Sequence, residues 1–169
     1  MNTTGTAGPG YALYDARQHD AAIEQELKSL ELDPNYHLAR SILGRAYLEK
    51  AMFKQAIAEF EKVLATSPNN ILLLADLGRA YALAGRKAEA QSVIGQLIER
   101  SKKAYVFPKG LVMIYTGLGE NDQAFEWLDK SYEDRSLGSS LALKSSPIFD
   151  PLRSDPRFTD LLRRLNLQP

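Results

Sequence analysis

The chain has 169 residues, which is enough for one domain that, if compact, buries about 70% of the surface exposed by its unfolded chain. Lys plus Arg equals Asp plus Glu at 21 each, so no global basic field attracts nucleic acid or an anionic membrane. The absence of Cys excludes disulfides and thiolate chemistry, and no apolar stretch reaches the roughly 18–20 residues that a membrane span needs.

The amino-terminal residues 1–10 are predicted to form a flexible segment. They combine Thr, Ala, Gly and Pro, and they lack both the basic and the apolar parts of a secretion signal. A cytoplasmic location is therefore expected.

A fixed repeat period organises the sequence from residue 11 to residue 138. The period is about 34 residues, a length that indicates a repeated helical hairpin. Four sets of residues recur at this spacing: Leu43, Leu77 and Leu111; Tyr47, Tyr81 and Tyr115; Ala51, Gly85 and Gly119; and Ala56, Ala90 and Ala124. The period predicts full units at 37–70, 71–104 and 105–138, preceded by a degenerate first unit that ends at residue 36.

Each unit is expected to be a pair of antiparallel helices. Leu43, Gly44 and Tyr47 share one helix face, and the small Ala56 stands where a second helix must approach closely. Gly85 and Gly119 fall between the two helices, where a left-handed residue commonly ends a helix. No segment alternates with a period of two, so the chain is predicted to be all-α.

The carboxyl-terminal residues 139–169 are predicted to form a loop and a capping helix. Asp155 followed by Pro156 is a favourable helix start, and Phe158, Leu161, Leu162 and Leu165 then form one apolar stripe. An amphipathic helix of this kind covers the apolar face that remains at the end of a repeat array.

The repeated pattern resembles the tetratricopeptide repeat over roughly residues 10–138. Leu-Gly-x2-Tyr is intact at Leu43 and Leu77, and Ala-x3-Phe is intact at Ala56, whereas Arg40 and Leu74 replace the expected Trp. The resemblance implies a right-handed α-α superhelix of helical hairpins that serves as a scaffold for protein–protein interaction, without catalysis.

The carboxyl-terminal part also resembles the ends of repeat arrays in bacterial signalling proteins. Residues 117–128 followed by 150–158 are similar to the closing segments in bacterial Ser/Thr kinases, nucleotide cyclases and winged-helix regulators. This resemblance implies an alternative role as a regulatory or oligomerisation module of a larger signalling or transcription-regulating system.

Residues that could carry chemistry are sparse. His19 and His37 are isolated and are expected to face solvent, so no metal-ligand set is predicted. No glycine-rich phosphate loop or serine nucleophile motif occurs, and Asp150, Asp155 and Asp160 are interpreted as helix-start or surface carboxylates. The chain is therefore predicted to be no enzyme and to bind no cofactor or metal.

The family resemblance implies that the first helix of each unit lines a concave groove. The groove is predicted to consist of Leu38, Ser41, Arg45, Leu48, Leu72, Ala75, Arg79, Ala82, Val106, Lys109, Met113 and Thr116.

Apolar residues mixed with separated cations suit a peptide that carries apolar anchors and acidic groups. The alternative is that Arg45 and Arg79 pair with nearby acids such as Glu49 and Asp76. The sequence leaves both interpretations open.

Two further alternatives concern the partner. A helical-repeat RNA reader shares the hairpin pattern, but the balanced charge argues against it, and no nucleic-acid or membrane partner is expected. The degenerate first unit lacks a preceding neighbour, and this leaves Ile23, Leu27 and Leu30 in need of cover. A homo-oligomer formed through this unit is therefore a candidate.

Overall fold

The computed structural model describes residues 8–102, 108–134, 143–144 and 146–167, and this part of the chain is helical without strands. The helices in chain order are α1 (Pro9–Asp15), α2 (His19–Leu32), α3 (His37–Glu49), α4 (Phe53–Thr66), α5 (Ile71–Leu83), α6 (Lys87–Ser101), α7 (Lys109–Leu118), α8 (Asn121–Glu133), the 3-10 helix η1 (Pro147–Leu152) and α10 (Pro156–Arg164). The predicted all-α fold is confirmed.

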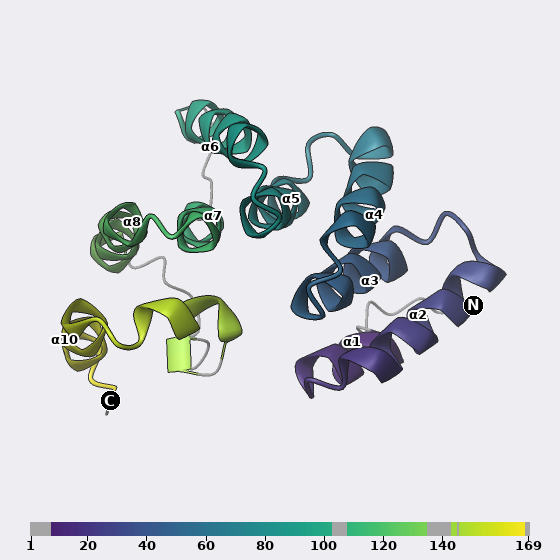
Figure 1. The fold of residues 1–169 in the computed structure, drawn as a ribbon, viewed down its shortest axis with the longest axis horizontal. Coiled ribbons are helices and arrows are strands. Elements are labelled where there is room, and N and C mark those ends of the chain that lie inside the picture. Colours follow the sequence, from purple (N-terminus) through teal and green to yellow (C-terminus); the bar gives the residue numbers. More distant parts are fainter. Residues whose placement is uncertain (1–7, 103–107, 135–142, 145, 168–169) are drawn as a thin grey trace.

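The helices from α1 to α8 form successive hairpins that follow one another around an arc (Figure 1). The first helix of each hairpin, α1, α3, α5 or α7, lies on the inner side of the arc. The second helix of each, α2, α4, α6 or α8, lies on the outer side. The inner helices together form the concave side of the molecule, called the inner wall below.

A residue with left-handed backbone conformation reverses the chain within each hairpin. These residues are Arg17, Ala51, Gly85 and Gly119, with φ values of 58°, 56°, 74° and 75°, and each follows the last by one repeat period. In each case the next amide donates a hydrogen bond of 2.8 or 2.9 Å back to the inner helix, as Met52 N does to Tyr47 O. This is the Schellman arrangement of a helix carboxyl end.

The first hairpin is therefore a full member of the array, although its sequence is degenerate. Its turn residue Arg17 occupies the same place as Gly85. Pro9 and Gly10, predicted to lie in a flexible segment, instead begin α1, whereas residues 1–7 lie outside the described part.

Close contact between the inner and outer helix holds the second hairpin together. A Cβ atom on Gly44 would collide with the ring of Phe60, which is fully buried. Phe60 packs with Leu48, Val63 and residues of α5 in one apolar cluster, so the same side chain also joins this hairpin to the next. Glycine is required at residue 44 because any side chain would force the two helices apart.

The carboxyl-terminal helix α10 begins at Pro156, as the sequence predicts, and the Asp155 carboxylate accepts a hydrogen bond from Arg157 N. Phe158, Leu161 and Leu162 are buried against side chains of α7 and α8. The apolar stripe therefore covers the end of the array. Residues 139–142 of the predicted loop lie outside the described part.

Two glycines inside helices give a matched test of hairpin packing. Gly44→Ala is expected to lower the free energy of unfolding by about 1–3 kcal/mol because the new methyl group overpacks the contact with Phe60. Gly95→Ala, inside α6 with no atom near its would-be Cβ, should raise it by about 0.5–1 kcal/mol through helix propensity. Urea unfolding measures both, and equal effects of the two substitutions would contradict the packing.

Candidate functional site

The structure places the predicted groove residues at different depths of the inner wall. Leu38 and Leu72 are 40% and 60% exposed, and Lys109 is also exposed. Ser41, Arg45 and Arg79 are half-buried. The remaining described members are buried and unavailable to a partner: Leu48, Ala75, Ala82, Met113 and Thr116. Val106 lies outside the described residues.

Two ion pairs cross between α3 and α5 on the inner wall. Arg45 on α3 reaches forward to Asp76 on α5, with Nη2 and Oδ2 2.7 Å apart, and Arg45 Nε donates to the same oxygen. Arg79 on α5 reaches back to Glu49 on α3, with Nη1 and Oε1 2.8 Å apart. The pairing that the sequence left as an alternative is therefore present, and it connects consecutive hairpins.

Asp76 is the buried member of this group. Burial raises the pKa of its carboxyl, and the neighbouring Arg45 opposes that rise. A buried carboxylate depends on such a partner, because an isolated charge is costly to remove from water. The Arg45–Asp76 pair is therefore part of the framework of the inner wall.

Lys109, the first residue of α7, differs from the two arginines. It has no hydrogen-bond or ion-pair partner among the described residues. Partial burial lowers the pKa of its ammonium group, Asp76 raises it, and Arg45 and Arg79 lower it further. Together with the two ion pairs, Lys109 forms a group of three cations and two carboxylates, in which the positive charge is in excess by one.

Tyr11 and Tyr14 on α1 extend the inner wall, although sequence reasoning missed them. Burial is the main cause that raises the pKa of Tyr14 to about 12, and Glu49 adds to it. Helix α1 packs against α3, and both tyrosines interact electrostatically with the Arg45 guanidinium on α3. The signal was available, because one further repeat period back from Arg45 and Leu48 leads to Tyr11 and Tyr14.

His19 does not fit its expected place in solvent. Its ring lies against Tyr14 with a centroid distance of 5.7 Å, and its Nδ1 atom is buried without a hydrogen-bond partner among the described residues. The short turn that follows α1 brings the start of α2 against Tyr14. His37 is exposed, as predicted.

Comparison with known families addresses the central part of the array. Residues 48–107, from the end of α3 to the segment before α7, match the family model described as tetratricopeptide repeat. This central part of the chain is similar to tetratricopeptide repeats. Such repeats generally mediate protein–protein interactions, and the fold is typically a non-catalytic scaffold. No curated protein matches the chain.

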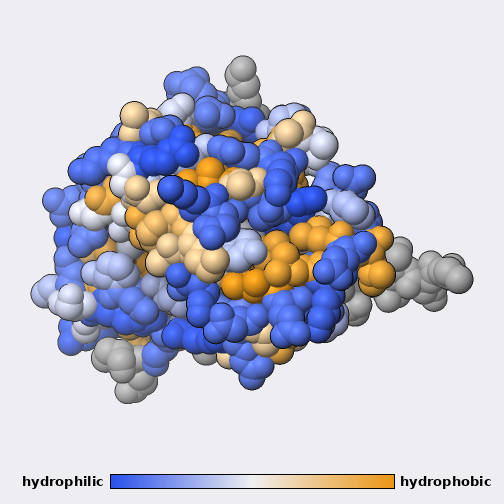
Figure 2. Space-filling model, turned by 45° about the vertical axis from the view of Figure 1, so that its right-hand side comes forward, coloured by the Kyte–Doolittle hydropathy of each residue, from blue (hydrophilic) through white to orange (hydrophobic). Residues whose placement is uncertain are grey.

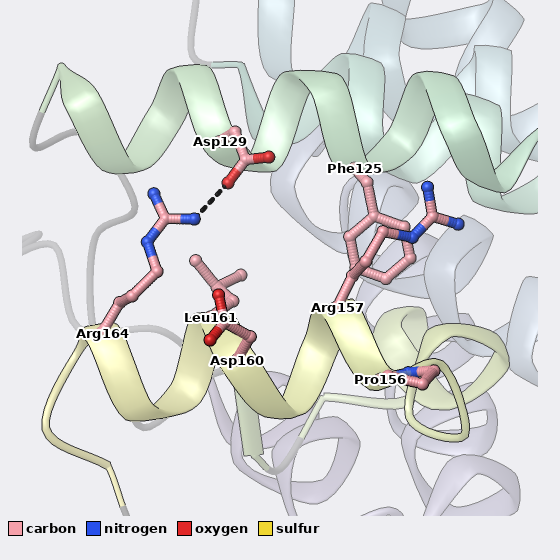
Figure 3. A pocket seen from close by; sticks show the side chains of 7 residues that line it. All are labelled: Phe125, Asp129, Pro156, Arg157, Asp160, Leu161 and Arg164. Carbon is pink, nitrogen blue, oxygen red and sulfur yellow. Dashed lines mark hydrogen bonds and ion pairs between the residues drawn. The ribbon is translucent and has the colours of Figure 1, made fainter.

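Beyond the matched residues, a pocket of about 320 Å³ lies between α8 and α10 (Figure 3). Arg157 lies 4.2 Å above the centroid of the Phe125 ring, and Arg164 pairs with Asp129 at 2.6 Å. The complete lining is Phe125, Asp129, Pro156, Arg157, Asp160, Leu161 and Arg164. Its two arginines are engaged by aspartates, whereas the exposed Asp160 has no hydrogen-bond or ion-pair partner among the described residues. A single exposed carboxylate is not a binding site, and the pocket is part of the contact between α8 and α10.

The described residues carry few groups suited to other chemistry. Among the described residues, no cluster of three or more His, Asp or Glu side chains could hold a metal ion. None of the helices described here is long and apolar enough to cross a membrane.

Removal of Asp76 tests the structural role of the crossed ion pairs. Asp76→Ala should lower the free energy of unfolding by about 3 kcal/mol or more, because Arg45 is left half-buried without its carboxylate. Glu24→Ala, which breaks the exposed pair with Lys28, should cause only a small fraction of that loss. Urea unfolding measures both variants. Similar losses of unfolding free energy would show that the Arg45–Asp76 pair does not stabilise the fold more than an exposed pair does.

Proposed function

We propose that the inner wall of the tetratricopeptide array binds an extended or helical segment of a partner protein and performs no catalysis. The proposal is supported by the general role of these repeats in protein–protein interaction. It is also supported by the side chains that the inner wall leaves exposed, which suit a peptide with apolar anchors and acidic groups.

Leu38 and Leu72 supply the apolar part of this surface. They occupy equivalent places at the starts of α3 and α5, one repeat apart, and both remain accessible. Two apolar side chains of a bound segment would each contact one leucine. This contact removes apolar surface from water and favours binding.

Lys109 supplies the charge, and its lack of a partner is the observation on which the proposed specificity depends. It stands at the start of α7, one repeat period beyond Ala75, in a group with excess positive charge. A carboxylate of the partner would provide the missing counter-charge and a charge-assisted hydrogen bond. The bound segment is therefore expected to place its apolar side chains over α3 and α5 and its acidic group beside α7.

A selected peptide tests this assignment. Peptides from a displayed random library, chosen for binding to the wild-type chain, should carry apolar residues and at least one carboxylate. Lys109→Glu and Leu72→Ser should each weaken their binding at least tenfold, as measured by fluorescence anisotropy. Both residues are exposed, and Lys109 has no hydrogen bond or ion pair to lose, so both variants should remain folded. The melting temperature of Lys109→Glu should fall slightly, because the new carboxylate repels Asp76.

Lys87→Glu is the matched control, because Lys87 is an exposed lysine at the start of the outer helix α6. It should bind the selected peptides as the wild type does. Equal binding by the wild type, Lys109→Glu and Leu72→Ser would contradict the proposal that the inner wall binds the peptide. Charge reversal of Arg45 or Arg79 is less informative, because the new Glu would face Asp76 or Glu49 and disturb folding.

A second candidate is a regulatory or oligomerisation module that associates through the first hairpin. Leu27 on α2 is 44% exposed, whereas Ile23 and Leu30 beside it are half-buried. A second copy could cover this face. Sedimentation velocity should then show a concentration-dependent dimer that Leu27→Glu abolishes, and a monomer at all concentrations would reject this candidate.

A further inference from the structure

In the first hairpin, a buried carboxyl group lies between the two helices, at the place where the other hairpins have an apolar side chain. The residues at this place in successive hairpins are Glu26, Phe60, Ile94 and Leu128, each one repeat period after the last. In the first hairpin, a Cβ atom on Gly10 would collide with the Glu26 carboxylate, as one on Gly44 would collide with Phe60. The Glu26 carboxylate therefore lies directly against the backbone of α1.

Glu26 is buried apart from a small contact of its carboxylate with solvent. It is 3% exposed and has no hydrogen-bond or ion-pair partner among the described residues. Burial is the cause that raises the pKa of its carboxyl. The titratable groups on the helices packed against α2 are Tyr11, Tyr14 and Asp15 on α1 and His37, Arg40, Arg45, Tyr47 and Glu49 on α3, and none of them is a cause of this shift.

The position of helix α1 depends on its packing against neighbouring helices. It has only 7 residues, and its amino end at Gly8 has no side-chain cap. So short a helix is not stable alone in water, and its position must come from packing on α2 and α3. The same helix brings Tyr11 and Tyr14 to the Arg45 guanidinium on the inner wall.

We propose that ionisation of Glu26 governs the docking of α1 onto α2. The docked helix adds Tyr11 and Tyr14 to the inner wall, and the undocked helix removes them. A charged carboxylate needs water, and it gains full access to water when α1 leaves, whereas the neutral acid tolerates burial. The consequence for partner binding rests on the proposed function. The docking step concerns the free chain alone.

The direction of the pH dependence follows from linkage. The docked state holds the Glu26 proton more tightly than the undocked state does, so docking is strongest at low pH. The equilibrium constant for docking falls by up to tenfold per pH unit above about pH 4.3, the ordinary pKa of Glu. It becomes constant once Glu26 is ionised in both states. Low pH therefore favours the complete inner wall, and higher pH favours loss of its first helix.

Hydrogen–deuterium exchange of the free chain tests the proposal. Exchange is measured between pH 4.5 and 8 and corrected for the intrinsic rate at each pH. In the wild type, the protection of residues 9–15 should fall with rising pH and then level off, whereas α6 should keep its protection. Glu26→Gln should remove the pH dependence, because the amide has the same shape and does not ionise.

Glu31→Gln is the matched control, since Glu31 lies on the same helix but is exposed. Its α1 protection should follow the wild type. If Glu26→Gln leaves α1 unprotected at every pH, Glu26→Leu decides, because it supplies the apolar residue found at Leu128 and should give high protection without pH dependence.

The proposal is overturned if the wild type and Glu26→Gln show the same pH dependence, if α1 protection in Glu26→Leu still falls with pH, or if α1 and α6 lose protection in parallel. None of these measurements includes a partner. Their failure would leave the peptide-binding proposal intact, and loss of peptide binding to the inner wall would leave the docking result unaffected.

Discussion

The left-handed residue that reverses each hairpin is the constraint on which the rest of the structure depends. Arg17, Ala51, Gly85 and Gly119 adopt it at the same spacing, so each outer helix returns along its inner helix in the same way. Hairpins with one geometry stack in one orientation, since each presents the same faces to its neighbours. This stacking aligns α1, α3, α5 and α7 along the concave side, where Tyr11, Arg45, Arg79 and Met113 occupy equivalent places.

Stacking also decides which inner residues remain available to a partner. The crossed pairs Arg45–Asp76 and Arg79–Glu49 use most of the charge of the inner wall to join α3 to α5. Apolar residues deep in the wall, such as Leu48, are covered by neighbouring hairpins. The exposed members of the predicted groove, Leu38, Leu72 and Lys109, lie at the starts of α3, α5 and α7. Figure 2 shows apolar areas between polar ones on one face of the molecule.

The sequence predicted the fold well because the repeat period is a property of the chain itself. It placed the hairpins and the turns at Gly85 and Gly119, where glycine marks the left-handed residue. It missed the turn at Arg17, which lies one repeat period before Ala51, because an arginine does not itself mark a left-handed residue. Within the candidate site, helix periodicity predicted which residues share a face of α3 and α5, and their role in binding stays a prediction. The burial of Ala75 and the partners of Arg45 depend on how far each hairpin rotates against the next, which periodicity does not specify.

The central claim is that stacking of identical hairpins creates one docking surface on the inner helices. Backbone amide chemical-shift mapping with a peptide selected on the wild-type chain tests it most directly. The account predicts that the largest shifts fall on α3, α5 and the start of α7, with small shifts on the outer helices α4, α6 and α8. Shifts confined to the outer helices, or to the pocket between α8 and α10, would contradict it.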